Sequence, residues 1–182
     1  MLAPNTLLSS LLLIAALAWT GAVAPAQAGP PAAGHRAHVH GQAELDFVLD
    51  DAGFEAELRM PMDSLVGFER APASEAERQA LDQALAALKD PDRVLRATTA
   101  ARCTGRLLAI QTPKWREGDS AHADVEARYR FDCAERARLM AAEVVVFEAF
   151  SRLRRIDTRS VDASGARSQR LGRNARVAKL SR

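Results

Sequence analysis

The sequence predicts an α+β fold in which antiparallel strands are combined with two helical segments. The clearest observation is a pair of runs, residues 45–49 and 54–60, in which apolar and polar side chains alternate. The turn-forming residues 50–53 lie between these runs and predict a β-hairpin. A third alternating run, residues 125–133, predicts another strand with one face in the core.

The first helical segment has a start signal and a clear apolar face. Ser74 can accept a hydrogen bond from the backbone of Glu77, whose carboxylate can return the bond, as in a capping box. Leu81, Leu85 and Leu88 then follow at helical spacing on one face. These signals predict a helix that ends before the Lys-Asp-Pro sequence at residues 89–91.

The remaining elements are predicted from shorter patterns. A second helix is expected over residues 134–142, and further strands over residues 106–110, 156–161 and 176–180.

Two similar segments raise the hypothesis of an internal pseudo-repeat. Residues 145–150 resemble residues 65–70, because each segment contains a Phe-Glu pair after branched apolar residues. A duplicated unit of a strand and a helix would explain the similarity. Chance is the alternative explanation.

The first 28 residues have the features of a signal peptide. They contain no charged side chain, run apolar through residues 11–18, and end in Ala26-Gln27-Ala28, the small-x-small pattern of a cleavage site. A membrane anchor is the alternative, but Pro25 and other residues break the apolar stretch, which is shorter than the ~20 residues that a spanning helix needs. We therefore expect export, cleavage near Gly29, and no stable membrane insertion afterwards.

The mature chain, residues 29–182, is long enough for one hydrophobic core and too short for two comfortable domains. It would comprise a single domain with a histidine-containing N-terminal segment, residues 29–42, and a basic C-terminal end, residues 167–182. The formal net charge of +2 gives no reason to expect nucleic acid as a partner.

The basic C-terminal end has a cationic residue at every third position from Arg167 to Arg182. This spacing fits neither the strand period nor one face of a helix. An edge strand with a solvated end is the favoured interpretation, and contact with anionic lipid or an acidic protein surface is the alternative.

The chain has two cysteines, Cys103 and Cys133. In an exported protein an even count predicts a disulfide, and Cys133 is in phase with the buried side of its strand. The alternative is a metal site that uses both thiolates.

Three of the four histidines, His35, His38 and His40, lie within six residues near the predicted mature N-terminus. Such a cluster suggests a ligand that several imidazoles share. On extended backbone His38 and His40 would point to the same side and could chelate one zinc ion.

Five segments together carry a resemblance to a known family. They are His38–Leu45, Leu65–Pro72, Cys103, His122–Cys133, and Phe147–Phe150 with Arg154–Asp157. In this order along the chain they resemble the DUF2796 family, the ZrgA-type periplasmic zinc uptake proteins. The resemblance implies a periplasmic protein that binds zinc and assists its uptake, with a zinc transporter or its binding protein as partner.

The sequence departs from the family pattern in two places. Many members carry a long run of His and Asp in the middle loop, whereas residues 113–124 here contain only one histidine, His122. Many also have His where this chain has Arg70, which cannot ligate a metal because it stays protonated.

Zinc prefers four ligands, so two histidines do not complete a site. The predicted ligands are His38 and His40, completed from His35, His122 or a carboxylate such as Glu69 or Asp124. The alternatives are loose metal binding by a histidine-containing leader, or no metal role.

No catalytic motif is found in the sequence. It lacks His-Glu-x-x-His, Gly-x-Ser-x-Gly and a phosphate-binding glycine loop. We therefore expect a non-enzymatic periplasmic protein that functions in zinc uptake or zinc homeostasis. The alternative is an exported structural or protein-interaction module that binds metal only loosely.

Overall fold

The structure is a computed structural model, and it describes residues 39–115 and 123–180. The described residues belong to one compact unit. Within them, nine strands form two sheets and only three α-helices are present. The fold is therefore mostly β, and the α+β class predicted from the sequence is wrong.

The larger sheet has six strands. In order across the sheet they are β4 (Cys103–Gln111), β5 (Asp124–Cys133), β2 (Gly53–Pro61), β1 (Gln42–Leu49), β7 (Arg155–Asp162) and β8 (Gly165–Gly172). Neighbouring strands are antiparallel except for β1 and β7, which run parallel.

The smaller sheet has three short antiparallel strands, β3 (Leu95–Ala97), β6 (Ala141–Val144) and β9 (Val177–Lys179). The helices are α1 (Met62–Val66), α2 (Glu75–Lys89) and α3 (Val146–Ala149). Three 3₁₀ turns, η1 (Pro91–Arg93), η2 (Thr99–Ala101) and η3 (Arg136–Arg138), complete the described elements.

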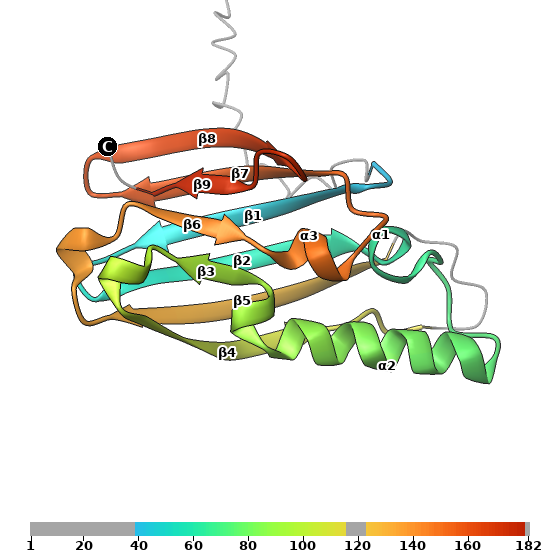
Figure 1. The fold of residues 1–182 in the computed structure, drawn as a ribbon. Helices are drawn as coiled ribbons and strands as arrows, with labels where there is room; N and C mark the ends of the chain where they lie inside the picture. The colour runs from blue at the N-terminus through green and yellow to red at the C-terminus, as the bar shows by residue number, and fades with distance from the viewer. Residues whose placement is uncertain (1–38, 116–122, 181–182) are drawn as a thin grey trace, which may run out of the picture. The chain divides into compact units, whose positions relative to one another are not determined.

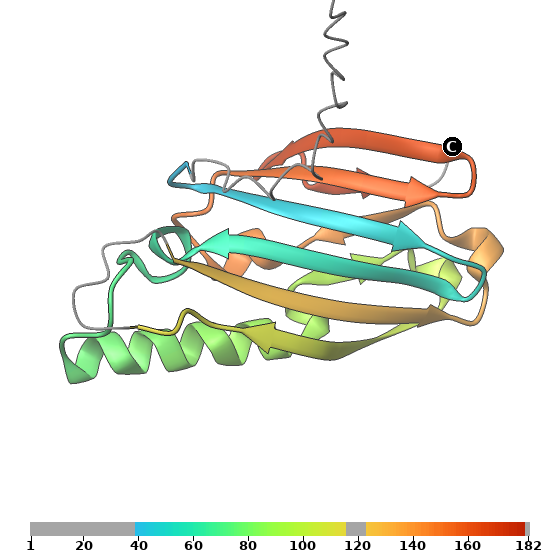
Figure 2. The ribbon, with the colours of Figure 1, turned by 180° about the vertical axis from the view of Figure 1, so that it is seen from behind.

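The hydrophobic core lies between one face of the large sheet and the elements that cover it. Figure 1 shows the small sheet and α2 in front of the large sheet, and Figure 2 shows the opposite face of the large sheet uncovered by other elements. Tyr129 of β5 is fully buried, and its hydroxyl donates to the Leu88 carbonyl at 2.8 Å. This bond joins the last turn of α2 to the large sheet.

The long sequence patterns are confirmed. The hairpin forms from β1 and β2, with Leu49 opposite Phe54. Ser74 caps α2 by accepting from the Glu77 backbone at 3.2 Å, and the Glu77 carboxylate accepts from the Ala73 backbone at 2.6 Å.

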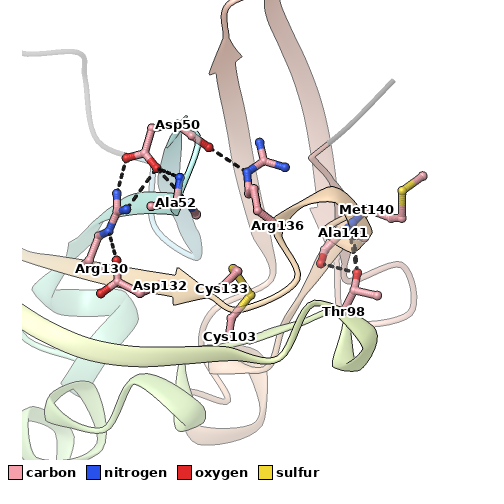
Figure 3. The surroundings of a disulfide bond; sticks show 11 residues. Asp50, Ala52, Thr98, Cys103, Arg130, Asp132, Cys133, Arg136, Met140 and Ala141 are labelled. Carbon is pink, nitrogen blue, oxygen red and sulfur yellow. Dashed lines mark hydrogen bonds and ion pairs between the residues drawn. A yellow bond between two sulfur atoms is a disulfide. The ribbon is translucent and has the colours of Figure 1, made fainter.

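The predicted disulfide is confirmed between Cys103 and Cys133. The two residues are directly opposite each other on β4 and β5 (Figure 3). The described residues contain no free cysteine, and a thiolate metal site is therefore excluded for this oxidised chain.

The predicted helix over residues 134–142 does not form. That segment contains a turn, η3 and the first residues of β6, and Leu139 is buried. Its Ala, Glu, Arg, Leu and Met residues favour helix locally. Pairing of β6 with β3 and β9 outweighs this preference, because the pairing completes the sheet that covers the core.

The hypothesis of an internal pseudo-repeat is also not supported. The first Phe-Glu pair, Phe68-Glu69, lies in irregular structure after α1, whereas Phe147-Glu148 lies inside α3. The preceding strands, β2 and β6, belong to different sheets. The two segments therefore do not occupy equivalent places.

The basic C-terminal end includes most of β8, which is an edge strand of the large sheet, and β9. This agrees with the favoured interpretation from the sequence. Among the described residues, no helix has the length and apolar character needed to span a membrane.

Candidate metal site

The candidate site is built on the turn that leads into β1. Gly41 adopts a φ of 78°, a conformation that favours glycine. Its backbone N–H donates to the buried hydroxyl of Ser64 on α1 at 2.9 Å, and its carbonyl accepts from the N–H groups of Arg154 and Arg155. His40 is therefore held on a backbone tied to α1 on one side and to the start of β7 on the other.

Two carboxylates lie close to the His40 ring. Asp63 of α1 has Oδ2 at 3.8 Å from Nδ1, and Glu69 has Oε1 at 3.6 Å from Nε2. The His40 side chain is 62% exposed, whereas those of Asp63 and Glu69 are 22% and 19% exposed. An accessible imidazole thus lies between two carboxylates that are largely shielded from solvent.

The two ring nitrogens give these carboxylates different chemical possibilities. Only one imidazole nitrogen is needed to bind zinc, and the other can donate its N–H to a carboxylate that fixes the orientation of the ring. An ion at Nε2 would have Glu69 as a neighbouring oxygen ligand, while Asp63 could accept from Nδ1. The arrangement can provide one nitrogen ligand, one oxygen ligand and one orienting group.

This arrangement is not a complete site. Among the described residues, no three His, Cys, Asp or Glu side chains are arranged to hold a metal ion. The reason is that Asp63 and Glu69 approach opposite nitrogens of one ring, which leaves two protein ligands on either side at most. Zinc would need further ligands from elsewhere in the chain or from solvent.

Only part of the predicted ligand set can be compared with the structure. His40 and Glu69, both among the predicted ligands, lie close together. His35, His38 and His122 lie outside the described residues. Asp63 was not predicted from the sequence.

Arg70 occupies the place where many family members have His, and the structure gives it another role. Its guanidinium bonds both carboxylate oxygens of Glu77 at 2.7 Å and lies 5.3 Å from the centre of the Phe68 ring. Arg70 thus anchors the segment before α2 through Glu77.

Residues 37–180 match the model of the family described as ZrgA family zinc uptake protein. The chain belongs to this family. The match covers the large sheet, the small sheet and the whole His40 turn, and it confirms the resemblance found in the sequence. No curated protein matches the chain.

Membership of the ZrgA family indicates a role in zinc uptake. Within the described part of the chain, His40 is the only histidine, and it is the residue that lies between two carboxylates.

Proposed function

We propose that the protein binds zinc in the periplasm at a site centred on His40 and passes it on for uptake. The observation that carries the proposal is the position of His40, an accessible imidazole within 3.8 Å of two carboxylates, in a chain of a zinc uptake family. In the proposed site His40 Nε2 and Glu69 are ligands, and Asp63 orients the ring.

The remaining ligands are proposed to come from the histidines on either side of the described structure. His38 precedes His40 by two residues, and His35 lies three residues further back. His122 directly precedes Ala123, whose carbonyl accepts from the Met62 backbone N–H at 2.8 Å, next to Asp63.

A site whose ligands come from several segments of the chain suits transfer better than storage. One imidazole and one carboxylate are pre-positioned, while ligands that are not fixed to them can be exchanged for those of an acceptor. The acceptor would be a zinc transporter or its binding protein. Export by the predicted signal peptide would place this exchange in the periplasm.

Titration calorimetry of the mature, untagged protein tests the proposal. Wild type should bind one equivalent of zinc tightly. His40→Ala should lose tight binding because it removes a ligand, and Asp63→Asn should weaken binding by roughly 10 to 100-fold because it removes an orienting group. Glu55→Gln, at an exposed glutamate of β2, is the matched control and should bind like wild type.

The same measurement separates the alternatives. Glu69→Gln, His38→Ala, His35→Ala and His122→Ala identify which of the other proposed groups complete the site. Weak, multi-equivalent binding that is unaffected by His40→Ala would reject the proposal. It would leave an exported interaction module that binds metal only loosely.

A further inference from the structure

Two arginines, Arg152 and Arg154, precede β7 and lie next to the turn that carries His40. Arg152 and Arg154 are exposed and flank the buried Leu153. The backbone of this segment is bonded directly to the His40 turn, because the Arg154 N–H donates to the Gly41 carbonyl at 2.8 Å.

Each arginine side chain packs against a glycine near His40: Arg152 against Gly67, and Arg154 against Gly41. The Arg152 guanidinium lies over Gly67, where a Cβ atom would be 2.7 to 2.8 Å from its Nε, Cζ and Nη2 atoms. The similar distances mean that the guanidinium plane faces the glycine. The aliphatic part of Arg154 lies beside Gly41, with Cγ and Cδ each 3.5 Å from the corresponding Cβ position.

These guanidinium groups are available to a ligand. Within residues 39–115 and 123–180, neither Arg152 nor Arg154 makes a side-chain hydrogen bond or an ion pair. Other arginines at this end of the sheet are engaged: Arg173 donates to the carbonyls of Phe147 and Phe150, and Arg176 pairs with Glu143 and Glu148.

Two permanent cations are an unfavourable surrounding for a bare zinc ion. Guanidinium groups stay protonated, cannot act as metal ligands, and repel a divalent cation. They do bind carboxylates well, because their planar N–H donors match the two carboxylate oxygens. The combination of one imidazole, two carboxylates and two arginines therefore favours a cation that arrives with an anionic companion.

We propose that the His40 site takes up zinc as a complex with a small polycarboxylate, whose free carboxylate groups are bound by Arg152 and Arg154. This inference rests on the proposed zinc site and names the chemical form of its cargo. The polycarboxylate supplies oxygen ligands in addition to those of the protein, and its negative charge offsets the two guanidinium groups. No covalent step is involved.

Zinc binding in the presence of citrate tests this inference. The mature chain is titrated at a series of citrate concentrations while free zinc is fixed by a metal buffer and checked with an indicator. If only the bare ion binds, affinity at constant free zinc is independent of citrate. If the protein binds the complex, we expect affinity to rise by about tenfold, within the usual range for coupled ligands.

Variants separate the arginine effect from the zinc site itself. The double variant Arg152→Gln/Arg154→Gln should lose the citrate enhancement and bind zinc more tightly without citrate, because two repelling charges are removed. The matched control Arg96→Gln/Arg128→Gln removes two exposed arginines from β3 and β5 and should keep the enhancement. Circular dichroism checks that each variant is folded.

The possible outcomes are distinct. Tight zinc binding in wild type with no citrate enhancement would overturn this inference and leave the proposed function intact. Equal enhancement in wild type and the Arg152/Arg154 variant would overturn it as well. Failure of wild type to bind zinc with or without citrate would reject both proposals.

Discussion

The two ends of the large sheet carry charged side chains that are bonded very differently. At the disulfide end, Arg130 is only 8% exposed and bonds the carboxylates of Asp50 and Asp132 (Figure 3). Asp50 also accepts from the backbone N–H groups of Ala52 and Gly53 at 2.9 and 2.8 Å. The charges at this end bond one another and the turn between β1 and β2.

At the opposite end, the charged groups around His40 are close together without comparable bonds between them. Its contacts with Asp63 and Glu69 are 3.8 and 3.6 Å long, beyond a normal hydrogen bond. The guanidinium plane of Arg152 packs on Gly67, and the aliphatic part of Arg154 packs on Gly41. Among the described residues, neither guanidinium group donates a hydrogen bond to an acceptor.

The difference separates structural charges from charges suited to a ligand. A buried arginine must be bonded, since leaving it without a partner would cost several kcal/mol. Exposed groups held near one another on a fixed backbone can instead bond something that arrives from solvent. We therefore expect substitutions at the disulfide end to change stability, and side-chain substitutions at the His40 end to change binding.

The largest effect on stability is expected from removal of the disulfide. Cys103 and Cys133 are separated by 30 residues, and the chain-entropy model gives about 3–4 kcal/mol for a cross-link of this span. The double variant Cys103→Ser/Cys133→Ser should lose about this free energy of unfolding in urea titrations. Its zinc affinity while folded should match wild type, because His40 lies at the other end of β1.

Reduced wild-type protein is the control for this comparison, and it should unfold at the same urea concentration as the double variant. A variant as stable as oxidised wild type would show that the cross-link adds nothing to the bonds around Arg130. A large loss of zinc affinity in folded variant would show that the two ends are coupled.

The second-largest effect on stability is expected from a substitution in the backbone near His40, at Gly67. Gly67 ends α1 with a φ of 91°, and its N–H donates to the Met62 and Asp63 carbonyls. An L-residue in this left-handed conformation costs roughly 1–2 kcal/mol. Gly67→Ala should lower the free energy of unfolding by this amount and displace the Arg152 guanidinium, which would also reduce the citrate enhancement.

Gly172→Ala is the matched control for Gly67→Ala. A Cβ at Gly172 would meet its nearest atom, the Arg154 carbonyl oxygen, at an ordinary distance of 3.6 Å, and this glycine does not have a positive φ. Its effect should stay within about 0.5 kcal/mol. Equal losses of stability in the two variants would mean that the left-handed conformation of Gly67 is not the cause of the loss.

The parts of the fold that the sequence predicted are those with long, regular patterns. β1, β2, β5 and α2 each extend over eight or more residues, enough for a period of two or 3.6 to be recognised. β3 and β6 have only three or four residues, too few to show a period, whereas the short β9 lies within the strand predicted over residues 176–180. Residues 134–142 were wrongly assigned to a helix because local preference was the only signal there.

The site was partly predictable as well. Residues 50 and 53 close the predicted hairpin, and the same register pairs Glu44 with Arg59. This register ends before Asp63, because β2 ends at Pro61 and Asp63 lies in α1, so Asp63 could not have been found from the hairpin alone. Arg152 and Arg154 could not either, because the parallel pairing of β1 with β7 places them there and no local pattern specifies it.

The smallest effect on stability is expected from the charge of Asp50. Hydrogen bonding from Arg130 is the main cause that lowers the pKa of Asp50 from 3.8 to about 2. Because the folded-state pKa lies below the unfolded one, this stabilisation is fully present above about pH 4. It is lost as the pH falls through 2.

Asp50→Asn keeps an oxygen that can accept from Ala52 and Gly53 but removes the negative charge beside Arg130. The Asp50 side chain is 49% exposed, so solvent screening limits the expected loss at pH 7 to about 1 kcal/mol or less. Arg70 also lowers the pKa of Glu77 to about 2, and acid unfolding of wild type therefore combines several groups.

The diagnostic quantity is the stability difference between wild type and Asp50→Asn, measured by urea unfolding from pH 7 to pH 2. That difference should shrink towards zero below pH 3, while a constant difference across this range would show that Asp50 acts through its shape and backbone bonds and not through its charge.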